Sequence, residues 1–247
     1  MRAALNVRQW AQWALDSGNL QPITHPINKK WKTDSRHLLI GFRCVFKTYL
    51  KKTPAQLDAL RQFYKAVVGN ARIEQAEEEK AEQGQLSLRL TPVGVQRLPR
   101  TEEEAQRCFR DILAGLGRCH ELKSVWWFVI CALMPFFAHT AFVHSLIDIR
   151  WPNVIERFGR WYLIDAEYAA VEGTPFPEGL KDVLPGAQTC SPESDLYMVG
   201  RLLQQLEDRV LGTEGKKLRD VLLSEKRREW TATRLATGHA WLARLRD

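Results

Sequence analysis

The stretch DIRWPN occupies residues 148–153, and LID follows at residues 163–165. In this spacing Asp148 can accept a proton from a hydroxyl group. Asn153 and Asp165 supply oxygen ligands of the kind that a hard cation such as magnesium prefers. Asp and Asn are also common turn residues, so a buried cap of a turn is the alternative interpretation. The surrounding sequence helps to choose between the two.

The residues between the two motifs predict a β-hairpin. Residues 154–155 begin one strand, FGR at residues 158–160 supplies a turn with a glycine, and WYLI at residues 161–164 is typical of a return strand. Asp165 would then follow the end of that strand and lie close to Asn153 across the hairpin.

Three further segments predict amphipathic helices. TEEE at residues 101–104 is a capping box, which marks a helix start. Residues 194–203 begin with Ser and Asp and continue with apolar spacing, and residues 231–242 form a last helix that closes on an aromatic residue. The first helix has one apolar stripe at helical spacing, formed by Ala105, Cys108, Phe109, Ile112, Leu113 and Leu116.

The order of these motifs resembles the C-terminal lobe of the protein kinase superfamily, from about residue 85 to residue 247. The wording of DIRWPN is most similar to kinase-like domains of fungal and oomycete Crinkler-type proteins. The resemblance implies an α+β, two-lobed fold. Residues 1–94 would form a degenerate N-terminal lobe with an N-terminal helical extension, and residues 95–247 a mainly helical C-terminal lobe.

The same resemblance implies residue roles. Asp148 would be the catalytic base, and Asn153 and Asp165 would bind Mg2+. Arg150 stands where the family has a lysine, so it would neutralise charge on the transferring phosphoryl group; a surface cation is the alternative. Asp195 would tie back to the backbone of the catalytic loop.

The N-terminal half matches less well. Lys47, at the end of the strand RCVFK, would contact ATP, and the alternative is an ordinary solvated lysine. The next helix, over residues 54–68, contains no Glu to pair with it, and Gln62 stands at about the right spacing. Residues 85–90 alternate as a half-buried strand, and TPVG at residues 91–94 ends it where the resemblance places the hinge between lobes.

The departures from the family pattern leave two functions open. Leu146 stands where the family usually has a histidine, Glu167 replaces a glycine, and the first hundred residues contain no Gly-x-Gly-x-x-Gly loop. One function is an ATP- and Mg2+-dependent kinase that transfers the γ-phosphate to a Ser or Thr hydroxyl of a protein. The other is an inactive pseudokinase that serves as a binding or scaffold module.

Residues 123–143 precede the DIRWPN motif and are strongly apolar. The resemblance implies a helix ending near Leu122 and then the catalytic loop, so an insertion from a retained intron or a gene-model error is the favoured interpretation. A buried core helix is a second. A membrane segment anchored by Trp126 and Trp127 is the least favoured, because the fully apolar part, residues 125–138, is shorter than the ~20 residues that a span needs.

Composition favours an intracellular protein, cytoplasmic or nuclear. The five cysteines are an odd number without a Cys-x-x-Cys pair, which argues for a reducing compartment and against zinc or a disulfide framework. No signal peptide is visible, because Met1 to Leu15 alternates polar and apolar residues and reads as an amphipathic helix.

The charge pattern gives no specific partner. The net charge of +7 arises partly from basic clusters at residues 29–36 and 216–228, but no nucleic-acid motif accompanies them, so solvated surface is the preferred interpretation. The acidic stretch at residues 74–85 predicts a solvated helix end or a flexible loop between two strands.

Overall fold

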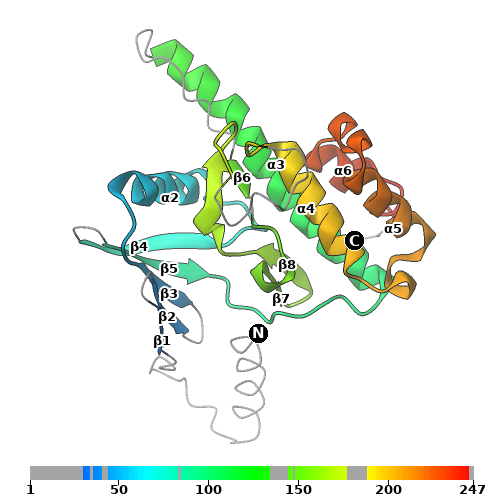
Figure 1. The fold of residues 1–247 in the computed structure, drawn as a ribbon, viewed down its shortest axis with the longest axis horizontal. Helices are drawn as coiled ribbons and strands as arrows, with labels where there is room; N and C mark the ends of the chain where they lie inside the picture. The colour runs from blue at the N-terminus through cyan, green and yellow to red at the C-terminus, as the bar shows by residue number, and fades with distance from the viewer. Residues whose placement is uncertain are drawn as a thin grey trace, which may run out of the picture.

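The computed structural model is a mixed α and β fold, as predicted (Figure 1). It describes residues 30–33, 36–40, 44–82, 85–133, 144–146, 148–176 and 188–244. The amphipathic helix predicted at residues 1–15 lies outside the described residues.

One part of the molecule is an antiparallel sheet with the strand order β1-β2-β3-β5-β4. Helix α2, Pro54–Ala66, connects β3 to β4 and lies against the sheet (Figure 1). Its start is fixed by a capping box between Thr53 and Gln56, with Pro54 at the first helical position. The strands are β1 Lys30–Lys32, β2 Arg36–Ile40, β3 Val45–Tyr49, β4 Gln75–Glu82 and β5 Gln85–Thr91.

The alternation predicted for β5 is confirmed. Leu86, Leu88 and Leu90 are buried, and the residues between them are only half-buried. Together with Phe63 of α2 and Tyr49 of β3, they belong to a hydrophobic core that continues into the helices. The strand ends at Thr91, so the break predicted at residues 91–94 is also confirmed.

The prediction for the acidic stretch at residues 74–85 is wrong. Residues 75–82 form the edge strand β4, paired with β5 on one side. Glu77 lies opposite Arg89 of β5 and forms an ion pair with it. Strand pairing satisfies the backbone here and charged side chains suit a sheet edge, so a composition typical of loops can still form a strand.

The other part is helical. Its helices are α3 Glu102–Leu133, α4 Pro192–Gln204, α5 Asp208–Leu223 and α6 Ala232–Gly238. Figure 1 shows α3 running through the middle of this part, and its predicted apolar stripe is completely buried. The predicted start of α3 is confirmed, because the amide of Glu104 donates to Oγ1 of Thr101.

Some predicted boundaries differ. Helix α4 begins earlier than residue 194, because Ser191 is its N-cap, and α6 ends at Gly238, before the buried Trp241. Helix α3 does not end near Leu122 but continues to Leu133, so the first part of the proposed insertion at residues 123–143 extends this helix. Residues 134–143 lie outside the described residues.

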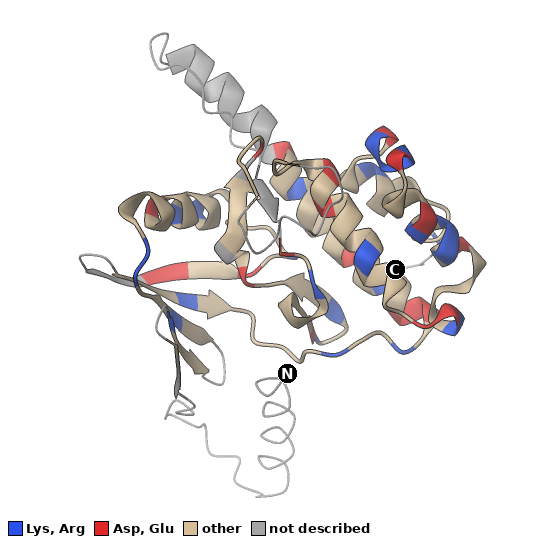
Figure 2. Ribbon diagram, viewed as in Figure 1, with Lys and Arg blue, Asp and Glu red and all other residues tan. Residues whose placement is uncertain are grey.

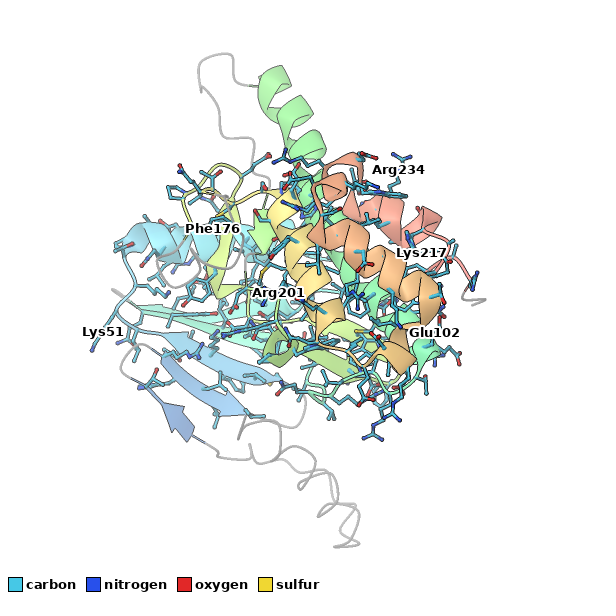
Figure 3. The ribbon with its side chains drawn as sticks, turned by 45° about the vertical axis from the view of Figure 1, so that its right-hand side comes forward. Lys51, Glu102, Phe176, Arg201, Lys217 and Arg234 are labelled. Carbon is cyan, nitrogen blue, oxygen red and sulfur yellow. The ribbon has the colours of Figure 1, made fainter. Side chains whose placement is uncertain are left out.

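The described residues include no helix with the length and apolar character needed to cross a membrane. Lysine and arginine residues occur in the sheet and in the helices rather than in one element alone (Figure 2). Figure 3 locates Lys51 beside the sheet, and Lys217 and Arg234 on the helices at the opposite side.

The short hairpin that the sequence predicts is confirmed. It consists of β7, Val154–Arg157, and β8, Arg160–Leu163. The amide of Glu74 donates to the carbonyl of Leu163, at 2.9 Å, and the amide of Leu163 donates to that of Arg72, at 3.0 Å. A second two-stranded sheet pairs β6, His144–Leu146, with β9, Ala169–Val171. Leu163 near the end of residues 148–165 is thus hydrogen-bonded to the segment before β4. Strand β6, which precedes Asp148, is paired with β9.

Candidate functional site

A cleft of about 330 Å3 lies between the sheet and the hairpin. This volume falls in the range of small-molecule sites, which are mostly apolar with a few convergent polar groups. Its apolar lining includes Leu38, Val45 and Leu90 of the sheet and Ile155 of the hairpin. Its polar lining consists of Arg36, Lys47, Glu74, Gln96, Arg150, Asn153 and Asp165.

Lys47 and Asp165 meet in this cleft although they lie 118 residues apart in the chain. Nζ of Lys47 is 2.5 Å from Oδ1 of Asp165. The alternative that Lys47 is a solvated lysine is wrong, because its side chain is only 3% exposed. A buried ammonium group needs an opposite charge nearby, and Asp165 supplies it.

Both charges of this pair are stabilised. Burial alone would lower the pKa of Lys47, but Tyr49 and the carboxylates of Asp165 and Glu74 raise it above its ordinary value. Burial would raise the pKa of Asp165, but the charge and hydrogen bond of Lys47 outweigh burial and hold that pKa below its usual range. Asp165 has a left-handed backbone, with φ of 64°, which Asp tolerates better than most residues.

Asp148 lies in a short turn beside the cleft and lines a small adjoining cavity together with Asp165. Nδ2 of Asn153 donates to the carbonyl of Asp148, at 2.9 Å, and to its Oδ2, at 3.0 Å. Nε of Arg150 is 2.9 Å from Oδ1 of Asp148. Asn153 therefore does close the turn, as the alternative interpretation held, while its side chain still lines the cleft.

The pKa of Asp148 lies above its ordinary value. Burial is the main cause, and the nearby charge of Asp165 adds to it. Arg150 and the amide of Asn153 oppose this rise. The carboxyl of Asp148 is thus shifted toward the range in which a group can accept a proton near neutral pH.

The side-chain oxygens of Asn153 and Asp165 in the cleft are of the kind that could hold one hard cation. The amide of Ile164 donates to the carbonyl of Asn153, at 2.9 Å, which holds Asn153 next to the start of Asp165 across the hairpin. Within the described ranges no three His, Cys, Asp or Glu side chains gather as a metal cluster. One carboxylate and one carboxamide, with water and ligand oxygens completing the shell, suit Mg2+ better than zinc.

The acid expected beside Lys47 comes from a different element. Gln62, the candidate on α2, is exposed. Helix α2 instead presents the buried Tyr64, whose hydroxyl donates to Oε1 of Glu74 at 2.5 Å. The amides of Asp165 and Ala166 donate to the same oxygen, at 2.7 Å and 3.2 Å. Glu74 therefore connects α2 to the segment that carries Asp165.

Glu74 is a residue that the sequence did not reveal. Burial raises its pKa, although Lys47 and Tyr64 act in the opposite direction. Its position at the start of an acidic stretch hid it, because the residues that follow it, such as Glu77 and Glu78, are exposed. Burial distinguishes Glu74 from the exposed acidic residues after it, and burial cannot be read from composition.

Arg36 is the second residue that the sequence did not reveal. It was grouped with Lys29, Lys30 and Lys32 as part of a solvated basic patch. The structure places its guanidinium in the cleft, with Nη1 3.6 Å from Oδ2 of Asp165.

The second basic cluster, at residues 216–228, lies on α5 and the turn after it. Lys217 pairs with Glu214, and Arg228 pairs with Glu225. These ion pairs with acidic neighbours favour the interpretation as solvated surface for Lys217 and Arg228. That interpretation is wrong for Arg227, which is buried and donates to the carbonyl of Ser224.

Asp195 is completely buried near the start of α4. The structure gives His120 of α3 as a partner, with Nε2 2.8 Å from Oδ2 of Asp195. A histidine from another element thus lies beside this aspartate, while Leu146 occupies the position at which the family pattern has one. The tie from Asp195 to the catalytic loop stays a prediction.

Neither the protein-family models nor the curated proteins include a match to this chain, so the geometry of the cleft must carry any functional conclusion.

Proposed function

We propose that the chain is a protein kinase-like phosphotransferase that binds ATP with Mg2+ in the cleft. The sheet with α2 would be the smaller lobe, and α3 to α6 would belong to the larger one. The observation that carries the proposal is that Lys47, Asn153 and Asp165 line one cleft although Lys47 is distant in the chain, and that Asp148 is hydrogen-bonded to Asn153 beside it. A chance match to a short motif would not bring the distant Lys47 to Asp165.

The side chains support a division of roles. Asp148 would accept the proton of a Ser or Thr hydroxyl on a protein substrate, since its carboxyl is oriented by Asn153 and has a raised pKa. Lys47 would bind phosphate oxygens with its buried ammonium group. The apolar side chains of Leu38, Val45 and Leu90 would contact the adenine ring of ATP.

Arg150 lies at the mouth of the cleft, where its side chain is 57% exposed. From there it would neutralise charge on the phosphoryl group as it moves to the substrate. Asn153 and Asp165 would be the protein ligands of Mg2+, which when bound would offset the charge of the phosphates.

An inactive pseudokinase is the second candidate function. Each expected catalytic carboxylate is paired with a cation, Asp148 with Arg150 and Asp165 with Lys47. Glu167 also replaces the family's glycine after the metal-binding Asp. In this case the fold would bind a partner, with or without nucleotide, and transfer no phosphate.

A thermal melt with and without ATP and Mg2+ tests the nucleotide site. Ligand at ~100 times its dissociation constant adds about 2.7 kcal/mol of stability if it binds only the folded state. We expect a Mg2+-dependent rise in melting temperature for the wild type and none for Asp165→Ala. A well-folded wild type without any shift would contradict the proposal.

Phosphate transfer then separates the two candidate functions. Asp148→Asn should abolish transfer to a protein substrate under the first function, while its melt without ligand controls for folding. Full transfer by Asp148→Asn would rule out Asp148 as the base. A wild type that binds ATP and transfers no phosphate to any protein in a substrate panel would favour the pseudokinase.

A further inference from the structure

Among the residues that the structure describes, three cationic side chains line the cleft, and each contacts a carboxylate. Lys47 is buried and 2.5 Å from Asp165, and Arg150 is 2.9 Å from Asp148. Arg36 is 42% exposed, so like Arg150 it is not buried. Of these three contacts, the one between Arg36 and Asp165 is the longest, at 3.6 Å.

A loose, half-exposed ion pair can exchange its partner at little cost, because such pairs contribute at most about 1 kcal/mol. The guanidinium has five N–H donors in a planar fork, a geometry that matches phosphate as well as carboxylate. Arg36 thus has the chemistry to bind a phosphate group that enters the cleft beside Asp165.

The position of Arg36 fits this role. It is the first residue of β2, and β1 pairs with β2 directly beside it, with Lys32 opposite His37. Arg36 therefore lies at the end of the strand pair that borders the cleft. The sequence before residue 100 contains no Gly-x-Gly-x-x-Gly motif, the pattern that in the family covers the phosphates with backbone amides.

We infer that Arg36 exchanges partners: it contacts Asp165 in the free protein and the outer phosphates of a bound nucleoside triphosphate in the complex. A side chain from β2 would then supply the phosphate contact for which a glycine-rich loop is absent from the sequence. This inference rests on the proposed function, because it uses the same cleft and the same Asp165. It adds that the cleft selects for phosphate number through Arg36.

Binding measured by titration calorimetry tests this inference, with adenosine, ADP and ATP as ligands in the presence of Mg2+. Loss of a charge-assisted hydrogen bond costs roughly 1.5–3 kcal/mol, so Arg36→Ala should weaken ATP binding about tenfold to a hundredfold. Adenosine binding should stay unchanged, and Arg36→Lys should lie between the two proteins for ATP.

Arg61→Ala is the matched control. Arg61 lies on α2, pairs with Asp58 and Glu78 at partial exposure, and does not line the cleft. Like Arg36→Ala, the substitution Arg61→Ala removes one positive charge from the part of the molecule that contains the sheet. It should leave the affinities for adenosine, ADP and ATP unchanged.

Equal weakening of ATP and adenosine by Arg36→Ala would indicate general damage to the cleft and overturn the inference. Unchanged ATP affinity would also overturn it. Magnesium tripolyphosphate, as a probe without a base, separates the inference from the proposed function. Tripolyphosphate binding that depends on Arg36, in a wild type that binds no ATP, would contradict the proposed function alone. A wild type that binds neither would overturn both.

Discussion

Arg150 opposes the rise in the pKa of Asp148 through an ion pair between the two side chains. Burial raises the pKa of Asp148, and Arg150 is the strongest of the groups that lower it. Arg150→Ala should therefore raise this pKa further. If Asp148 accepts the substrate proton, activity falls as the pH drops through this pKa, so the acid limb of kcat/KM should move to higher pH in the variant.

The measurement is a pH profile of kcat/KM for the wild type, Arg150→Ala and Arg160→Ala. Arg160 is an exposed arginine at the start of β8 and serves as the charge control. An acid limb at the same pH in all three proteins would mean that Arg150 does not tune Asp148.

The pair of Lys47 and Asp165 gives stability with a defined pH dependence. The pKa of Asp165 in the folded protein lies below its ordinary value of 3.8. The stability that it contributes is thus fully present above about pH 4, and is lost as the pH falls through the lowered pKa. We expect this loss on acidification in the wild type and its absence in the double variant Lys47→Met/Asp165→Asn.

Urea unfolding between about pH 2 and pH 7 measures this difference. Glu74 has a raised pKa and thus the opposite pH dependence, and because Lys47 lowers that pKa, its contribution differs between the two proteins. The comparison is therefore repeated in a Glu74→Gln background, which removes this contribution from both. Asp165→Asn alone leaves Lys47 buried without its carboxylate and should cost about 3 kcal/mol. Parallel curves for the wild type and the double variant would contradict the prediction.

At the scale of elements, the β7–β8 hairpin depends on its two turn residues. Phe158 and Gly159 both have a positive φ, of 52° and 77°, as two-residue hairpin turns of the I′ type require. A Cβ at Gly159 would contact nothing within 4 Å, so Gly159→Ala should cost about 1 kcal/mol through backbone conformation alone. Phe158→Asn should instead stabilise by about 0.5 kcal/mol, because Asn tolerates this conformation and the 90% exposed ring is not needed for packing.

Chemical unfolding of both variants tests the turn. The free energy of unfolding should fall in Gly159→Ala and rise in Phe158→Asn. Destabilisation by both substitutions would mean that the exposed Phe158 ring, which lies near the guanidinium of Arg157, contributes to the hairpin.

The helices and the hairpin could be predicted because their signals are local. The capping box at Thr101 and the apolar period after it specify the start and the buried face of α3 without reference to other elements. The end of α3 could not be predicted, because residues 123–133 carry no stop signal and the family resemblance implied an earlier end. Strand β4 was missed for the opposite reason: its partner β5, rather than its acidic composition, determines its conformation.

At the scale of the whole molecule, the limit of prediction is the distance between contacting residues in the chain. Asp148, Asn153 and Asp165 lie in two motifs joined by one hairpin, so their proximity could be predicted from spacing and that hairpin. Glu74 reaches the amide of Asp165 over 91 residues, and no spacing rule predicts such a contact. Arg36 looked like its basic neighbours because only the packing of the sheet against the hairpin directs it into the cleft.

Long-range packing also lets Asp111 of α3 connect the helices to the hairpin and to the segment before β4, through two hydrogen bonds. From α3 its Oδ1 accepts from Nε of Arg72, at 2.6 Å, and its Oδ2 accepts from the amide of Trp161 in β8, at 2.9 Å. Asp111→Ala would leave this buried amide without its acceptor, while the partly exposed Arg72 could turn to water. We expect a loss of about 3 kcal/mol, and a smaller loss of about 1 kcal/mol for Asp111→Asn, which keeps an oxygen for Trp161.

Hydrogen exchange followed by mass spectrometry tests whether Asp111 specifically anchors the hairpin to α3 or only contributes to the general stability of the core. In Asp111→Ala the hairpin amides should lose protection before those of α4, because the hairpin loses its anchor to α3 while α4 keeps its own contacts. A core defect would instead lower the protection of both segments together. The candidate magnesium ligands lie at the two ends of this hairpin, at Asn153 and Asp165. An anchored hairpin is therefore the physical condition for holding them at a fixed separation, and Asp111→Ala should also weaken any Mg2+-dependent stabilisation by ATP.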